Sequence, residues 1–173
     1  MSIRGACGVV FAAAALMAMG AIPGREHAVV AAGPGAERLE AEVAAHPDDL
    51  ALRSDLARLY LDARSPGLAW RVVAGTPERL QGDPAVQHLA ARVLIEQGDA
   101  TLALAMEKNV LAACGGERPA SGCDFWLLVS ATRRAEILEA LVTSGVDDAI
   151  AHPEASLIAY HKATHEARLA VVE

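Results

Sequence analysis

The stretch DLARLYLDARSPGLAW, residues 55–70, decides how this chain folds. Its first half carries apolar side chains at helical spacing, which place them on one face of a helix. These side chains are Leu56, Leu59, Tyr60 and Ala63. Residues 65–67 (SPG) then separate this helix from a second apolar helical segment. The stretch therefore predicts a helical hairpin, either isolated or as one unit of a repeat.

The same pattern returns after an offset of 34 residues. Residues 58–63 (RLYLDA) align with residues 92–97 (RVLIEQ), and Leu68-Ala69 aligns with Leu102-Ala103. One hairpin cannot bury both sides of its apolar stripes, whereas hairpins stacked side by side can. The alignment therefore favours a repeat of hairpins over an isolated one.

A period of 34 residues with leucine, a small residue, a large apolar residue and alanine resembles the tetratricopeptide repeat. In the first unit these places are held by Leu56, Ala57, Tyr60 and Ala69. In the second unit the corresponding marks are Ala90, Ala91, Leu94, Gly98 and Ala103. The resemblance covers residues 36–114, with Arg53 where a first-helix aromatic is usual and Arg64 where the turn glycine is usual. It implies a short right-handed solenoid of antiparallel helical hairpins, with about two and a half to three units.

The composition also favours an all-α domain. The chain is 53% hydrophobic but only 3% aromatic, so its apolar residues are mostly Ala, Leu and Val. Ala and Leu are strong helix formers, and no segment shows the alternating β-branched pattern of strands. Asp48 or Asp49 can cap the first helix of the first unit, and Gly98-Asp99 can form the turn in the second.

The C-terminal part falls outside the 34-residue register. Residues 124–144 are predicted to form a helix with Asp124 as its N-cap, which the polar residues 132–134 (TRR) can interrupt. The last helix is expected to start at Pro153, because proline is favoured in a first helical turn. We expect this part to be a divergent third hairpin that covers the end of the stack.

The N-terminal segment has the layout of a secretory signal. Arg4 precedes an apolar stretch over residues 5–22, and small residues lie near a cleavage point at the end of residues 1–20. We therefore expect a signal peptide at 1–20, a flexible linker at 21–35 and a helical domain at 36–173, in a periplasmic or secreted protein. The alternative is that residues 5–22 stay uncleaved and anchor the chain in a membrane.

Cys114 and Cys123 flank a short polar loop, GGERPASG. In an exported protein, a pair of cysteines this close together is typical of a disulfide. Free thiols and a redox or metal site are the alternatives, although the spacing is not Cys-x-x-Cys and no further ligands stand beside the pair.

Arg58 and Arg92 occupy equivalent positions in the two units. In the family that the chain resembles, this position faces a concave groove that holds partner peptides, and stacked guanidinium groups there can bind a carboxylate. The residues expected to line the groove are Ser54, Arg58, Asp62, His88, Arg92 and Glu96. The alternative is that the arginines only form weak ion pairs one turn on, Arg58 with Asp62 and Arg92 with Glu96.

His161 and His165 form a His-x-x-x-His pair on the last helix. This spacing places both imidazoles on one face, where they can bind zinc or copper if Glu154, Glu166 or His152 supplies a third ligand. The alternative is that both rings pack partly buried against the neighbouring hairpin.

The remaining features restrict the class of function. The formal net charge of −7 and the lack of basic runs argue against nucleic-acid binding. No phosphate-binding loop, nucleophile motif or acidic metal loop is present in the sequence. We therefore expect a non-catalytic adaptor or scaffold without a cofactor, whose partner is another protein or a peptide. The alternatives are a metal-binding helical protein and, with less support, an enzyme or its accessory domain.

Overall fold

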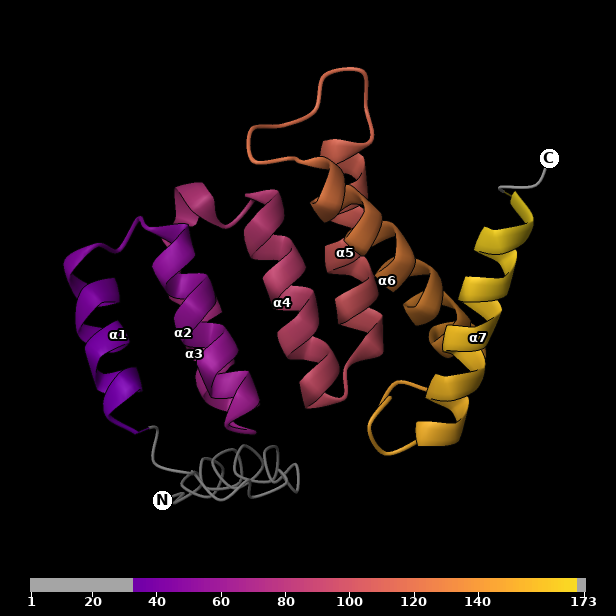
Figure 1. Ribbon diagram of the computed structural model, residues 1–173, viewed down its shortest axis with the longest axis horizontal. Coiled ribbons are helices and arrows are strands. Elements are labelled where there is room, and N and C mark those ends of the chain that lie inside the picture. Colours follow the sequence, from indigo (N-terminus) through magenta and orange to yellow (C-terminus); the bar gives the residue numbers. More distant parts are fainter. Residues whose placement is uncertain (1–32, 171–173) are drawn as a thin grey trace, which may run out of the picture.

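The structure is a computed structural model that describes residues 33–170, with side chains through Thr164. Over these residues the chain forms seven α-helices, one short 3-10 helix and no β-strand, which confirms the predicted all-α class (Figure 1). The elements are α1 (Pro34–Ala45), α2 (Leu50–Asp62), α3 (Pro66–Ala74), η1 (Glu78–Leu80), α4 (Pro84–Gln97), α5 (Ala100–Cys114), α6 (Phe125–Thr143) and α7 (Pro153–Ala170).

The helices form a row from α1 to α7, with α1 and α7 at opposite ends (Figure 1). Each α-helix packs against the next one along the chain, and α2 also contacts α4, which in turn contacts α6. Helix α4 therefore adjoins both α2 and α6, although α3 lies between α2 and α4 in the sequence and α5 lies between α4 and α6.

Aspartate side chains begin most of these helices. The carboxylates of Asp49, Asp83, Asp99 and Asp124 accept backbone N–H groups in the first turns of α2, α4, α5 and α6. Each such cap stabilises a helix by about 1 kcal/mol. Of the two predicted candidates for α2, Asp49 is the cap, and the predicted cap at Asp124 is confirmed. Gly98 ends α4 with a φ of 84°, a left-handed conformation that glycine adopts without steric cost.

Helix α6 differs from its prediction in one respect. The polar residues 132–134 do not interrupt it, because α6 is continuous over Phe125–Thr143. The Thr132 hydroxyl donates to the Leu128 carbonyl within the same helix, at 2.8 Å. The Arg134 guanidinium instead finds acceptors on α4 and α5, so that a polar residue in mid-helix costs little here.

Several alanines are fully buried in the packing between the helices. Four alanines of the predicted repeat are 0% exposed: Ala57, Ala69, Ala91 and Ala103. Because alanine has only a methyl side chain, two helix backbones can approach closely at such a position. Larger side chains surround these contacts in two main clusters, one centred on α1–α4 and the other on α4–α7.

Two polar side chains tie the N-terminal helices together. The buried Arg53 donates from Nε to the Pro47 carbonyl (2.8 Å) and from Nη1 to the Val72 carbonyl (3.1 Å). It thereby joins the turn before α2 to the last turn of α3, which explains how a charged residue occupies the place of an aromatic. The Tyr60 hydroxyl donates to Glu40 on α1. Burial, together with this contact, raises the pKa of Tyr60 to about 12.

The predicted leader lies outside the described residues. This holds for the signal peptide at 1–20, for the alternative anchor at 5–22 and for most of the linker at 21–35. Helix α1 begins at Pro34, two residues before the expected start of the domain, with the proline in its first turn. Between residues 33 and 170, no helix combines the length and apolar character that crossing a bilayer requires.

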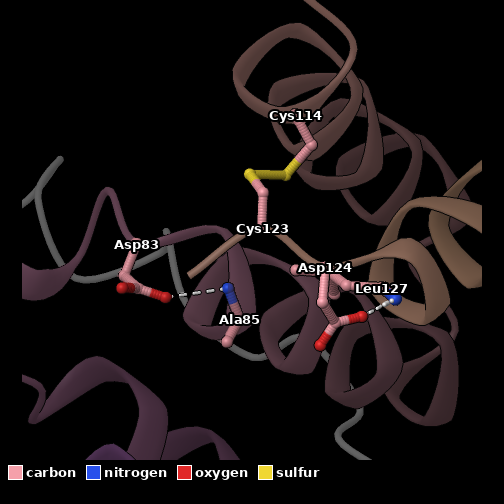
Figure 2. Close-up of a disulfide and its surroundings, with 6 residues drawn as sticks. All are labelled: Asp83, Ala85, Cys114, Cys123, Asp124 and Leu127. Carbon is pink, nitrogen blue, oxygen red and sulfur yellow. Dashed lines mark hydrogen bonds between the residues drawn. A yellow bond between two sulfur atoms is a disulfide. The ribbon is translucent and has the colours of Figure 1, made fainter. Parts of the chain in front are cut away.

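The predicted disulfide between Cys114 and Cys123 is present, with a Cα–Cα distance of 5.5 Å (Figure 2). Cys114 is the last residue of α5, and Cys123 immediately precedes Asp124, the N-cap of α6. Buried Val110 and Ala131 pack beside the half-cystines in a small third cluster. The disulfide therefore holds the start of α6 against the end of α5 across the loop.

The disulfide is expected to stabilise the fold measurably. Closing a loop of about ten residues contributes about 2–3 kcal/mol in the chain-entropy model. We predict that Cys114→Ser/Cys123→Ser lowers the free energy of unfolding by this amount in urea denaturation. The comparison is made in a Cys7→Ser background, so that no third thiol competes. Equal stability of the two proteins would contradict the prediction.

Candidate interaction groove

A cavity of about 200 Å³ lies where α2, α4 and α6 meet. Four of the six predicted groove residues line it: Ser54, Arg58, His88 and Arg92. The remaining lining residues are Ala85, Leu89, Leu127 and Arg134. The structure therefore brings together equivalent side chains of α2 and α4, and it adds Leu127 and Arg134 from α6, which the sequence analysis did not place in the groove.

Asp62 and Glu96 do not line this cavity. The ion pairs of the alternative interpretation, Arg58 with Asp62 and Arg92 with Glu96, are not formed. Arg58 lies 3.9 Å from Asp55 of its own helix, and Arg92 lies 3.8 Å from Asp62 across the α2–α4 contact. Asp62 reaches the neighbouring helix because α2 and α4 adjoin. Both pairs are long and solvent-exposed, so they hold the guanidinium groups only weakly.

A buried carboxylate supports the groove from behind. Glu107 of α5 is 0% exposed. Its Oε2 lies 2.9 Å from Nδ1 of His88, and its Oε1 accepts a hydrogen bond from Nη1 of Arg134 at 2.8 Å. Arg134 also donates to the backbone carbonyl of His88, at 3.1 Å. Glu107 thus orients two side chains that line the cavity from two different helices.

Both ring nitrogens of His88 have polar partners. Nδ1 lies 2.9 Å from Oε2 of Glu107, and Nε2 lies 3.1 Å from the Ser130 hydroxyl. Arg134 supplies the positive charge next to Glu107. A buried carboxylate with one guanidinium and a full set of hydrogen bonds avoids the cost of an unpaired charge.

Glu107 was missed in the sequence, although it left a signal. It stands in the apolar helix sequence ATLALAMEKNV, residues 100–110, where most other residues are apolar. The equivalent position one period earlier is Val73, a buried residue of α3. A glutamate at a core position of a repeat indicates a partner within the fold, but the sequence does not tell which residues provide it.

The lining of the cavity is cationic in an acidic chain. It contains three arginines and one histidine but no carboxylate. Of the acids that pair with these arginines, Glu107 is buried behind the cavity, and Asp55 and Asp62 lie outside its lining. An anion can therefore approach the guanidinium groups from the cavity side. Guanidinium groups bind carboxylates through paired, charge-assisted hydrogen bonds.

Only one member of the predicted histidine pair has a described side chain. His161 is exposed on α7 beside the ring of Tyr160, so the alternative in which it packs partly buried is wrong. The side chain of His165 lies outside the described residues. Among the described side chains, no group of three or more His, Cys, Asp or Glu residues can hold a metal ion.

We predict that Glu107→Gln destabilises the fold by about 2–4 kcal/mol. The amide presents donors to Arg134 and leaves a partly buried guanidinium without its counter-charge. Glu139→Gln is the matched control, because Glu139 forms an exposed ion pair with Lys108 and its loss should cost less than about 0.5 kcal/mol. Urea denaturation measures both values. Similar values for the two variants would show that Glu107 does not have this supporting role.

Comparison with known proteins identified no relative of this chain. No protein-family model matches the chain, and neither the curated proteins nor the solved structures gave a significant match. The chemistry and geometry of the groove are therefore the basis on which a function can be inferred.

Proposed function

We propose that this chain is a non-catalytic adaptor or scaffold that binds a segment of another protein in the groove across α2, α4 and α6. The observation that carries the proposal is the arginine lining. Arg58, Arg92 and Arg134 come from three adjoining helices and line one cavity without a carboxylate among them. Three guanidinium groups in a row match an extended segment that carries acidic side chains or a terminal carboxylate.

The fold that we propose for this function is a short right-handed solenoid of tetratricopeptide-like hairpins. Its units are α2–α3, α4–α5 and α6–α7, and α1 is the second helix of a truncated earlier unit. Two observations support it: the first helices of the units adjoin, and α2 and α4 start 34 residues apart, at Leu50 and Pro84. The longer connection before α6 contains the disulfide loop and accounts for the loss of the register there.

We further propose that the protein works in the periplasm or outside the cell. The disulfide supports this location, because such bonds form and persist in oxidising compartments. The signal-like sequence of residues 1–20 points in the same direction. The partner would then be a protein or peptide of the same compartment.

The groove is tested with a labelled probe. We use a fluorescein-labelled Gly-Ser peptide with a central run of Asp and Glu, and an isosteric peptide in which Asn and Gln replace the acids. The acidic peptide is expected to bind more tightly in fluorescence anisotropy. Arg58→Ala/Arg92→Ala should weaken its binding about tenfold or more, because each charge-assisted hydrogen bond contributes about 1.5–3 kcal/mol.

The control variant removes the same charge elsewhere. Arg38→Ala/Arg118→Ala loses two exposed arginines, one on α1 and one in the disulfide loop. Its affinity for the acidic peptide should stay within about twofold of the unmodified protein, since these exposed charges do not line the groove and salt screens them. Equal losses in the two double variants would show that net charge, and not the groove, attracts the peptide.

A further inference from the structure

A second hollow adjoins the groove on α6. It has a volume of about 350 Å³ and is lined by Trp126, Val129, Ser130, Arg133, Arg134 and Ile137. Arg134 lines both this hollow and the cavity of the groove, which Arg58 and Arg92 also line and which we call the arginine cavity. The two cavities therefore meet at one side chain, which Glu107 holds in place from behind.

The hollow exposes large apolar side chains to solvent. Trp126 is 76% exposed, the adjacent Phe125 is 69% exposed, and Val129 one turn on is also exposed. Exposed apolar clusters of this kind are typical of interaction sites, because the surfaces of monomeric proteins seldom carry large ones. Tryptophan in particular contributes strongly to protein interfaces, because a large area can be buried at a low cost in side-chain entropy.

Arg133 gives the hollow a fixed charged border. It donates to the Tyr160 hydroxyl of α7 at 2.6 Å, and its guanidinium lies 5.1 Å from the centre of the Tyr160 ring. No carboxylate lines the hollow, so Arg133 and Arg134 are its only charged lining groups. A purely apolar occupant would cover the Arg133 guanidinium, which donates to the neutral Tyr160 hydroxyl, without offering it a counter-charge, and this is unfavourable. Charge complementarity therefore favours an occupant that is both apolar and acidic.

We infer that the groove recognises a protein segment in which a large aliphatic or aromatic side chain lies close to an acidic group. This inference rests on the proposed function and adds a specificity. The carboxylate binds Arg58, Arg92 and Arg134, while the apolar side chain lies on Trp126 between Val129 and Ile137. Arg134 contacts the acidic part at the boundary of the two cavities.

The disulfide keeps the apolar part of this surface in position. Cys123 and the N-cap Asp124 directly precede Phe125 and Trp126, and Asp124 accepts the Leu127 N–H at 2.7 Å (Figure 2). The first turn of α6 is therefore held by a covalent bond and a cap. The backbone that carries Trp126 is thus ordered before a partner binds, which lowers the entropic cost of binding.

The test uses two matched sets of labelled Gly-Ser peptides. In the first set an Asp pair is followed by a leucine at increasing separations, and in the second set serine replaces the leucine. At the separation that matches the two cavities, the leucine peptide should bind about tenfold more tightly than its serine counterpart, because a leucine side chain is removed from water. In Trp126→Ser this leucine advantage should disappear, while the affinity for the serine peptide stays the same.

Trp70, the other tryptophan of the chain, provides the control. It lies on α3, outside the lining of both cavities, so Trp70→Ser should keep the leucine advantage. In Trp70→Phe, the emission of the remaining Trp126 should change when the leucine peptide binds and stay constant with the serine peptide. These two readouts separate contact with Trp126 from a general loss of stability.

The possible failures are distinguishable. Acidic peptides that bind through Arg58 and Arg92 without a leucine advantage, or with one that survives Trp126→Ser, would overturn this inference and leave the proposed function standing. If no acidic peptide binds better than its isostere, both this inference and the proposed function are contradicted. A dimer in sedimentation velocity that Trp126→Ser dissociates would assign the surface to a second copy of the chain, and this also overturns the inference.

Discussion

Close packing of helices at alanines is the constraint on which the rest of this structure depends. Ala57 and Ala91, together with Ala69 and Ala103, are fully buried where neighbouring helices meet. Because a methyl group takes little space, helix backbones can lie close together at such positions, and α4 adjoins both α2 and α6. A larger side chain at these positions would separate the helices and open the core. The arginine cavity exists because these three helices are neighbours.

The charge of Glu107 is a second constraint, because it holds together side chains of neighbouring helices. A groove that presents Arg134 beside a half-buried His88 needs a counter-charge, because a guanidinium that is partly removed from water is otherwise costly. Glu107 supplies it from α5, behind the groove, and leaves the solvent side of the cavity free of carboxylates. The same residue thus stabilises the contact between three helices and holds Arg134 in the surface that we propose to bind a partner.

Helix α6 connects the parts of the molecule on which the proposals depend. Its first turn, fixed by the disulfide and by Asp124, presents Trp126 to solvent. Its middle provides Arg134 to both cavities, and Arg133 contacts α7 through Tyr160. Had the polar residues 132–134 interrupted the helix, Trp126 and Arg134 would not share one face. Continuity of α6 is therefore a condition for a combined acidic and apolar binding surface.

The sequence by itself determined the helical class, several helix ends and the disulfide. These features depend on neighbouring residues: aspartate caps, a proline in the first turn, and two cysteines a few positions apart. Only the tertiary structure decided the partners of the charged side chains. Arg92 pairs with Asp62, and Glu107 with His88 and Arg134, which lie on different helices. Helical spacing indicates which residues share a face, but the packing of separate helices decides which faces meet.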